Sequence, residues 1–155
     1  MKIPFKILFF LFLFFIIACS SKNEKISILE DENLELQMID AYKEGYEELE
    51  KGDIIYAAKK FNEAELLFPQ SSWAPKAALM AAYVYYAQDY YFDAEAELKR
   101  FIKTYPKNPD IPYAHFLLAM CYYEKIVDEK KDLGPLLNAK EKFNFIIKNY
   151  PESDY

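Results

Sequence analysis

The sequence has few of the residues that catalysis and cofactor binding usually require. Its 155 residues include one histidine, three glycines and two cysteines. His115 is the only side chain that ordinarily titrates near neutral pH, but it lies in the predicted helix "YAHFLLAMCYY", where a packed, structural histidine is the simpler interpretation. Three separate glycines cannot form a phosphate-binding loop, and no His, Cys or Asp residues have metal-ligand spacing. We therefore expect no enzyme, no catalytic residues, no metal site and no cofactor.

Runs of basic residues are missing as well. The chain has 25 acidic and 19 basic residues and a net charge of -6, so a polyanion such as nucleic acid would be repelled. The carboxylates of "YKEGYEELE" and "DAEAELKR" lie at helix-surface spacing beside basic residues, and we expect them on solvated faces. Neither nucleic acid nor a small-molecule substrate is an expected partner.

The amino-terminal segment has the form of a signal peptide. Lys2 and Lys6 precede an uninterrupted apolar run of 11 residues, Ile7 to Ile17, whereas a membrane span needs about 20. Ile16-Ile17-Ala18-Cys19 then resembles a bacterial lipobox, in which cleavage precedes the cysteine and the thiol receives a diacylglycerol. A chance cysteine after an ordinary signal peptide is the alternative. We expect a signal peptide at 1–18 and a covalent lipid on Cys19, which would hold the chain on a membrane.

Three further expectations concern the mature chain. Removal of residues 1–18 takes away two lysines and no acid, which leaves 17 basic and 25 acidic residues and a net charge of -8. Cys121 has no partner if Cys19 is acylated, so we expect a buried thiol and no disulfide. Residues 20–33, "SSKNEKISILEDEN", are polar and aperiodic, so that 19–33 would be the lipidated cysteine and a flexible tether.

From residue 34 the sequence repeats itself, with Pro69, Pro106 and Pro151 at the corresponding corners. Apolar residues lie 5, 8 and 12 positions before each proline, on one stripe of a helix. They are Ala64, Phe61 and Ala57; Phe101, Leu98 and Ala94; and Ile146, Phe143 and Ala139. Residues suited to a turn precede each alanine by five positions: Gly52, Asp89 and Gly134. The preceding helix of each unit has a small residue, Gly45, Ala82 or Ala119, that would let two helices approach closely.

This pattern is typical of tetratricopeptide (TPR) repeats. The fold class is therefore all-α: three helix hairpins, at about 34–69, 74–106 and 110–151, stacked in a TPR-like, right-handed α-solenoid domain at 34–155. An insertion of eight residues between Tyr123 and Gly134 is expected to form a polar loop.

A solenoid of this kind offers a concave surface lined by the first helix of each hairpin. With the small residue as the eighth TPR position, the fifth, ninth and twelfth positions face inward. We expect a peptide groove at these positions, rich in tyrosine and methionine; ordinary packing between repeats is the alternative for any one of them. The residues are Tyr42, Tyr46 and Leu49; Leu79, Tyr83 and Tyr86; and Phe116, Met120 and Tyr123.

The lipobox, the tether and helix pairs containing "AAYVYYAQDYYFDAEAELKRFIKTYPKNPDIPYAHFLLAMCYYE" together resemble the BamD family of outer-membrane β-barrel assembly lipoproteins. The continuation "A...L.RFI..YP..P...YA" and the late "YP.S.Y" are the most telling parts, and the resemblance covers about the whole chain. It implies a periplasm-facing lipoprotein on the outer membrane, within the complex that inserts β-barrel proteins. Ser20 after the cysteine, by resemblance to enterobacterial lipoproteins, also favours the outer membrane.

In that family the amino-terminal repeats receive unfolded barrel substrates and the later repeats dock on the central barrel subunit. Family members continue with further helix pairs after the "YP.S.Y" corner, so we expect this chain to be truncated after the third repeat, which puts docking on the barrel subunit in doubt. The alternative function is that of another envelope TPR lipoprotein, which would organise cell-wall or division proteins.

Overall fold

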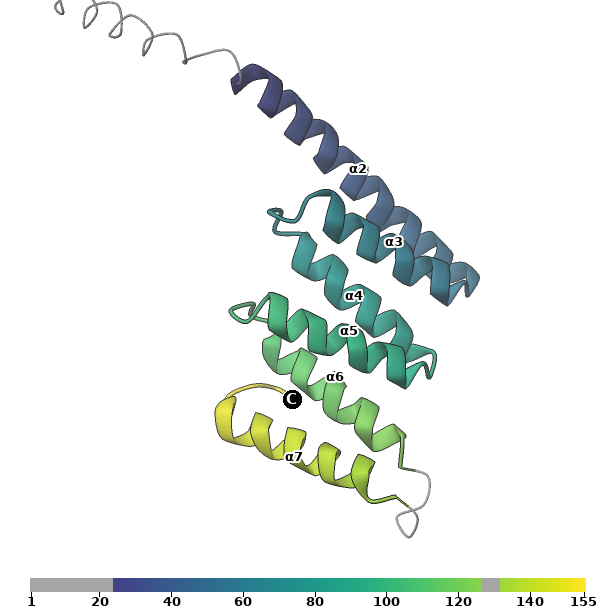
Figure 1. Ribbon diagram of the computed structural model, residues 1–155, viewed down its shortest axis with the longest axis vertical. Helices are drawn as coiled ribbons and strands as arrows, with labels where there is room; N and C mark the ends of the chain where they lie inside the picture. Colours follow the sequence, from purple (N-terminus) through teal and green to yellow (C-terminus); the bar gives the residue numbers. More distant parts are fainter. Residues whose placement is uncertain (1–23, 127–131) are drawn as a thin grey trace, which may run out of the picture. The chain divides into compact units, whose positions relative to one another are not determined.

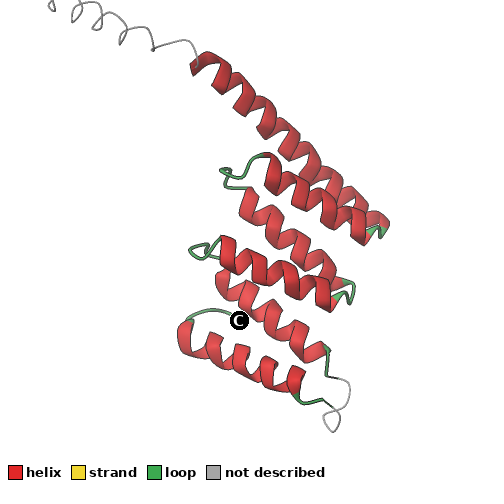
Figure 2. Ribbon diagram, viewed as in Figure 1, coloured by secondary structure: helices red, strands yellow, loops and turns green. Residues whose placement is uncertain are grey.

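A computed structural model describes residues 24–126 and 132–155 (Figure 1). The predicted signal peptide and Cys19 lie outside the described residues. The chain divides into two units, 1–33 and 34–155, and each is considered by itself. Throughout the described ranges the regular structure is helical (Figure 2), which confirms the predicted all-α, TPR-like fold. The helices are α2 (Glu24–Lys51), α3 (Ile54–Leu67), α4 (Ala74–Ala87), α5 (Tyr91–Thr104), α6 (Ile111–Glu124) and α7 (Gly134–Asn149).

Within residues 34–155, each helix packs against the next one along the chain. Contacts join α3 to α4, α4 to α5, α5 to α6 and α6 to α7, and α4 also touches α6. Met38 and Ala41 of α2 are buried against Ala64 of α3 and Ala77 of α4. The helices therefore form three successive hairpins, and the first helices of neighbouring hairpins lie close enough to share one surface.

Proline fixes where most of these helices begin and end. Pro75, Pro112 and Pro135 occupy the first turn of α4, α6 and α7, where a missing backbone N–H costs nothing. The residue before each corner proline leaves the helical conformation, with φ/ψ near -140°/73° at Phe68 and -121°/54° at Tyr105. Because the proline ring disfavours helical dihedrals in the preceding residue, α3, α5 and α7 all end just before a proline.

Two of the predicted turn residues have left-handed backbone conformations. Gly52 has φ +82° and Asp89 has φ +65°, values that are open to glycine and tolerated by aspartate. Gly134 instead begins α7. The inserted loop starts after Glu124, where α6 ends, and its residues 127–131 lie outside the described part of the chain.

The core is built from the apolar stripes that the corner prolines identify. Eight of the nine stripe residues are buried, with Phe61, Leu98 and Phe101 fully enclosed, and Phe143 is half-buried against the same core. Cys121 is a free thiol in this core, and burial raises its pKa to about 12. The prediction of a buried, unpaired cysteine is confirmed.

Part of the polar stretch before residue 34 is helical. Residues 24–33 belong to α2 and are helical, whereas a flexible tether was predicted over 19–33. The stretch has neither glycine nor proline between residues 20 and 33, and it contains several glutamates and a leucine, which favour helix. A polar composition without periodicity therefore did not prevent helix formation.

Candidate peptide-binding groove

The first helix of the first hairpin forms one side of an aromatic pocket of about 440 Å³, which we call the Trp73 pocket. The ring of Tyr42 lies 5.4 Å from that of Trp73, 5.4 Å from that of Tyr46 and 5.2 Å from that of buried Phe61, all in edge-on geometry. Aromatic pairs in this geometry contribute stabilisation beyond the burial of their apolar area, and this favours one orientation of the rings. The lining residues are Met38, Ile39, Tyr42, Lys43, Tyr46, Glu47 and Trp73.

A second pocket, of about 400 Å³, is shared by α2, α4 and α6, and we call it the Tyr83 pocket. Tyr42 belongs to both pockets. The hydroxyl of Tyr46, in the Trp73 pocket, donates a hydrogen bond of 3.8 Å to Sδ of Met80, in the Tyr83 pocket. This bond joins α2 to α4. The lining residues are Tyr42, Lys76, Leu79, Met80, Tyr83, Asp110, Tyr113 and Tyr155.

The structure brings together some of the predicted groove residues. Tyr42 and Tyr46 line the Trp73 pocket, and Tyr42, Leu79 and Tyr83 line the Tyr83 pocket. Tyr46 and Tyr83 are 43% and 38% exposed, so a ligand can reach them. Leu79 is 9% exposed and mainly serves the core.

Other predicted residues lie apart from these two pockets. Leu49, Tyr86 and Phe116 pack against the buried core, as the alternative interpretation allowed. Met120 is half-buried and Tyr123 is exposed, and neither lines the Trp73 or the Tyr83 pocket.

One row of pocket residues lies outside the predicted stripe. Ile39, Lys76 and Tyr113 stand three positions before Tyr42, Leu79 and Phe116, at the second position of each repeat. Because residues three apart share a helix face, extending the predicted stripe by one turn would have found all three. Trp73 and Tyr155 lie outside the first helices, and no repeat spacing indicated them.

Tyr42 and Tyr113 line the Tyr83 pocket as neutral hydrogen-bond donors. Burial raises the pKa of Tyr42 well above its usual value, with a further contribution from its hydrogen bond with Tyr46. Burial likewise raises the pKa of Tyr113. Both phenols therefore keep their protons at neutral pH, and the surface combines apolar rings with O–H donors.

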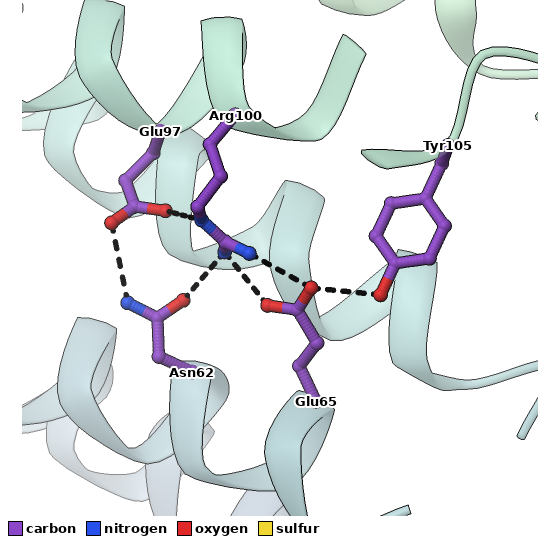
Figure 3. A network of polar contacts seen from close by, with 5 residues as sticks. All are labelled: Asn62, Glu65, Glu97, Arg100 and Tyr105. Carbon is purple, nitrogen blue, oxygen red and sulfur yellow. Dashed lines mark hydrogen bonds and ion pairs between the residues drawn. The ribbon is translucent and has the colours of Figure 1, made fainter. Parts of the chain in front are cut away.

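A partly buried ion-pair network holds α3 to α5, the second helices of the first two hairpins (Figure 3). Arg100, the only arginine of the chain, donates two hydrogen bonds to Glu65, at 2.8 and 2.7 Å, and one to Glu97, at 2.8 Å. Tyr105 donates to Glu65 at 2.7 Å, and Asn62 accepts from Arg100 at 3.0 Å. The bonds that Arg100 donates to Glu65, and then those to Glu97, raise the pKa of Arg100. The network thereby joins the first two hairpins, whose first helices, α2 and α4, line the Tyr83 pocket together with α6.

A second cluster surrounds Glu95, which accepts hydrogen bonds from Lys99, Tyr122 and Lys125. Lys125 also lies over the rings of Phe92 and Tyr122, 4.6 and 4.7 Å from their centroids. The expectation that the carboxylates of "DAEAELKR" lie on solvated faces is therefore wrong for Glu95 and Glu97. Helix-surface spacing does not reveal that a neighbouring hairpin covers that surface.

The described ranges hold neither a metal-binding cluster nor a helix suited to spanning a membrane. No group of three or more His, Cys, Asp or Glu residues at 32–126 and 132–155 could hold a metal ion. Over the helices that the structure describes, none combines the length and apolarity of a membrane span. His115 packs its ring 4.6 Å from that of Phe145, consistent with the predicted structural role.

The chain matches a family described as "YfiO: Outer membrane lipoprotein" over residues 34–155. Three curated relatives are each named outer membrane protein assembly factor BamD. The protein of Caulobacter vibrioides is 32% identical over 89% of this chain and 44% of its own length, and that of Rickettsia prowazekii is 30% identical over 89% and 53%. The protein of Neisseria gonorrhoeae is 28% identical over 74% and 46%.

The chain thus spans about half the length of the curated relatives it matches. The predicted BamD-family resemblance is confirmed by these names and by the extent of the match. The family match covers most of the chain, including all three helix hairpins from residue 34 onward, and the chain therefore belongs to the YfiO family of outer membrane lipoproteins.

Proposed function

We propose that this chain is a scaffold subunit of the machinery that assembles outer-membrane β-barrel proteins, and that it receives unfolded barrel segments in the groove formed by the Trp73 and Tyr83 pockets. The observation that carries the proposal is that two aromatic pockets share Tyr42 across α2, α4 and α6 in a member of this family. Exposed rings and neutral hydroxyls suit an extended, aromatic-rich peptide. The function is binding and not catalysis.

The proposed location is the periplasmic face of the outer membrane, with a lipid on Cys19 as the anchor. Support comes from the lipobox and from the family description as an outer membrane lipoprotein. The names of the relatives favour barrel assembly over the alternative, organisation of cell-wall or division proteins.

Capture from the native envelope separates these two functions. The full chain, crosslinked in cells and purified, is expected to recover the barrel-assembly subunits and unfolded outer-membrane proteins. Recovery of wall or division enzymes alone would overturn the proposal.

A groove variant tests the site itself. Tyr46→Ala with Tyr83→Ala should weaken binding of a carboxy-terminal peptide from an outer-membrane barrel protein by about tenfold or more, because each ring supplies exposed apolar contact area. Binding is measured by fluorescence anisotropy, and an unchanged circular dichroism spectrum confirms the fold. Tyr123→Ala is the matched control, since Tyr123 is exposed but lines neither pocket. Equal affinity in the double variant and the control would refute the groove.

A further inference from the structure

A third pocket, of about 350 Å³, lies among α5, α6 and α7 and shares no residue with the Trp73 and Tyr83 pockets. We call it the lysine pocket. Its polar lining comprises Lys99, Lys103, His115, Tyr122, Asn138, Glu141 and Lys142. Three lysines and one glutamate are among these residues, so the lining carries a net positive charge on a chain whose net charge is -6.

The three lysines differ in how far they are already neutralised. Lys99 is hydrogen-bonded to Glu95, and Lys142 pairs at 2.9 Å with Glu141, whose side chain is 69% exposed. Lys103 is exposed and makes no ion pair or hydrogen bond within the described part of the chain. Exposed pairs such as Lys142–Glu141 are weak, so Lys103 and Lys142 can both turn to a ligand.

His115 adds a neutral donor at the wall of the same pocket. Its Nδ1 is buried and lacks a hydrogen-bond partner among the described residues. Burial, and then the charge of Lys142, lower the pKa of His115, so the ring is neutral at physiological pH. Since a buried N–H without an acceptor is costlier than a buried lone pair, the proton belongs on Nε2, at the opposite edge of the ring.

We propose that the lysine pocket binds the carboxylate of an acidic segment on a partner protein. Lys103 and Lys142 supply the charge, and the amide of Asn138 and Nε2–H of His115 supply neutral donors. A single carboxylate fits better than a polyanion, because Glu141 stands among the lysines and the acidic chain repels extended negative surfaces such as nucleic acid or anionic lipid. At moderate salt, charges more than about 10 Å away are largely screened, so the lysines of the pocket affect a bound carboxylate more than the distant acidic residues do.

The single histidine provides a direct readout. The full chain, labelled with ¹⁵N-histidine, is titrated at constant pH with a terminally blocked peptide carrying two glutamates, and the His115 ring resonances are followed by NMR. The glutamine version of the peptide serves as the neutral control. Saturable shifts with the glutamate peptide alone are expected.

Charge variants localise the effect. The double variant Lys103→Gln with Lys142→Gln should bind the glutamate peptide about tenfold more weakly. The control Lys107→Gln with Lys148→Gln removes the same charge at exposed sites outside the pocket, and it should change the affinity less than about twofold. Equal losses in both pairs, or absence of a His115 shift, would overturn the proposal. Tighter binding of inorganic phosphate than of the peptide, or recruitment to anionic vesicles through Lys103 and Lys142, would also overturn it.

Discussion

At the scale of single residues, Gly45 shows how an absent side chain sets the distance between two helices. A Cβ placed there would lie 3.0 Å from two ring carbons of Phe61, which is tighter than nine in ten contacts of real Cβ atoms. Phe61 is fully buried and cannot give way. The small residue that repeat spacing predicted in α2 is therefore required by its contact with α3, and Ala82 and Ala119, both fully buried, occupy the matching places in α4 and α6.

Glu95 makes stability depend on acid. Burial by itself would raise its pKa, but hydrogen bonds from Lys125, Lys99 and Tyr122 prevail and lower it from 4.5 to about 2. The folded-state pKa is thus below the unfolded one, so the unfolded chain takes up the proton first. The stabilisation is complete above about pH 5 and is lost as the pH falls toward 2.

Glu95→Gln should therefore be less stable than the unmodified chain at neutral pH and should lose less of its stability on acidification. Urea unfolding midpoints measured from about pH 6 down to about pH 2 test this. Glu35→Gln, at an exposed position of α2, is the control and should keep the acid dependence of the unmodified chain. Parallel pH curves for all three would show that Glu95 contributes nothing to the acid response.

Sequence patterns predicted which residues are buried better than which polar residues pair with one another. Proline-anchored stripes identified Phe61 and Phe101 as core because burial repeats with the helical period. The same patterns could not distinguish buried Glu65 from a solvated glutamate, since its partner Arg100 lies 35 residues away in another hairpin. Long-range polar pairing depends on how hairpins stack, which local spacing does not encode.

At the scale of helices, Arg100 joins α3 and α5. Arg100→Met should cost about 3 kcal/mol of unfolding free energy, because Glu65, only 6% exposed in its side chain, would keep a buried charge without its bidentate partner. Chemical denaturation measures the loss.

Adding Glu65→Leu to Arg100→Met removes the stranded carboxylate, and this double variant should recover most of the stability. Arg100→Lys keeps the charge but not the fork of donors, so an intermediate loss is expected. A cost below about 0.5 kcal/mol for Arg100→Met would contradict this prediction, because the Arg100–Glu65 pair would then contribute no more than a surface ion pair.

Helix ends were predictable where proline determines them. α3, α5 and α7 end before Pro69, Pro106 and Pro151 because a proline imposes an extended conformation on its predecessor. The start of α2 was not predictable, because no proline or glycine precedes it closely in the sequence. For the groove, the first helices were correct but the stripe was one turn too short, so that Ile39 and Tyr113 were missed.

At the scale of the whole molecule, the groove and the lysine pocket share only α6. The groove draws on α2, α4 and α6, whereas the lysine pocket lies among α5, α6 and α7. Helix α6 contributes to both, because its Tyr113 lines the Tyr83 pocket and its His115 lines the lysine pocket. Two ligands of different chemistry, an aromatic segment and an acidic one, could thus occupy one repeat domain at the same time.

Attachment to the membrane is the remaining property of the whole chain, and our proposal assigns it to Cys19. Each buried CH₂ of an acyl chain contributes about 0.8 kcal/mol, so two or more chains hold a protein without a spanning helix. Cys19→Ala should abolish the added lipid mass in intact mass spectrometry of the mature chain. Cys121→Ser, a change at the buried thiol, should leave that mass in place. A mature chain recovered from membranes with an unmodified Cys19 would refute the anchor while leaving the helical repeats and their pockets unaffected.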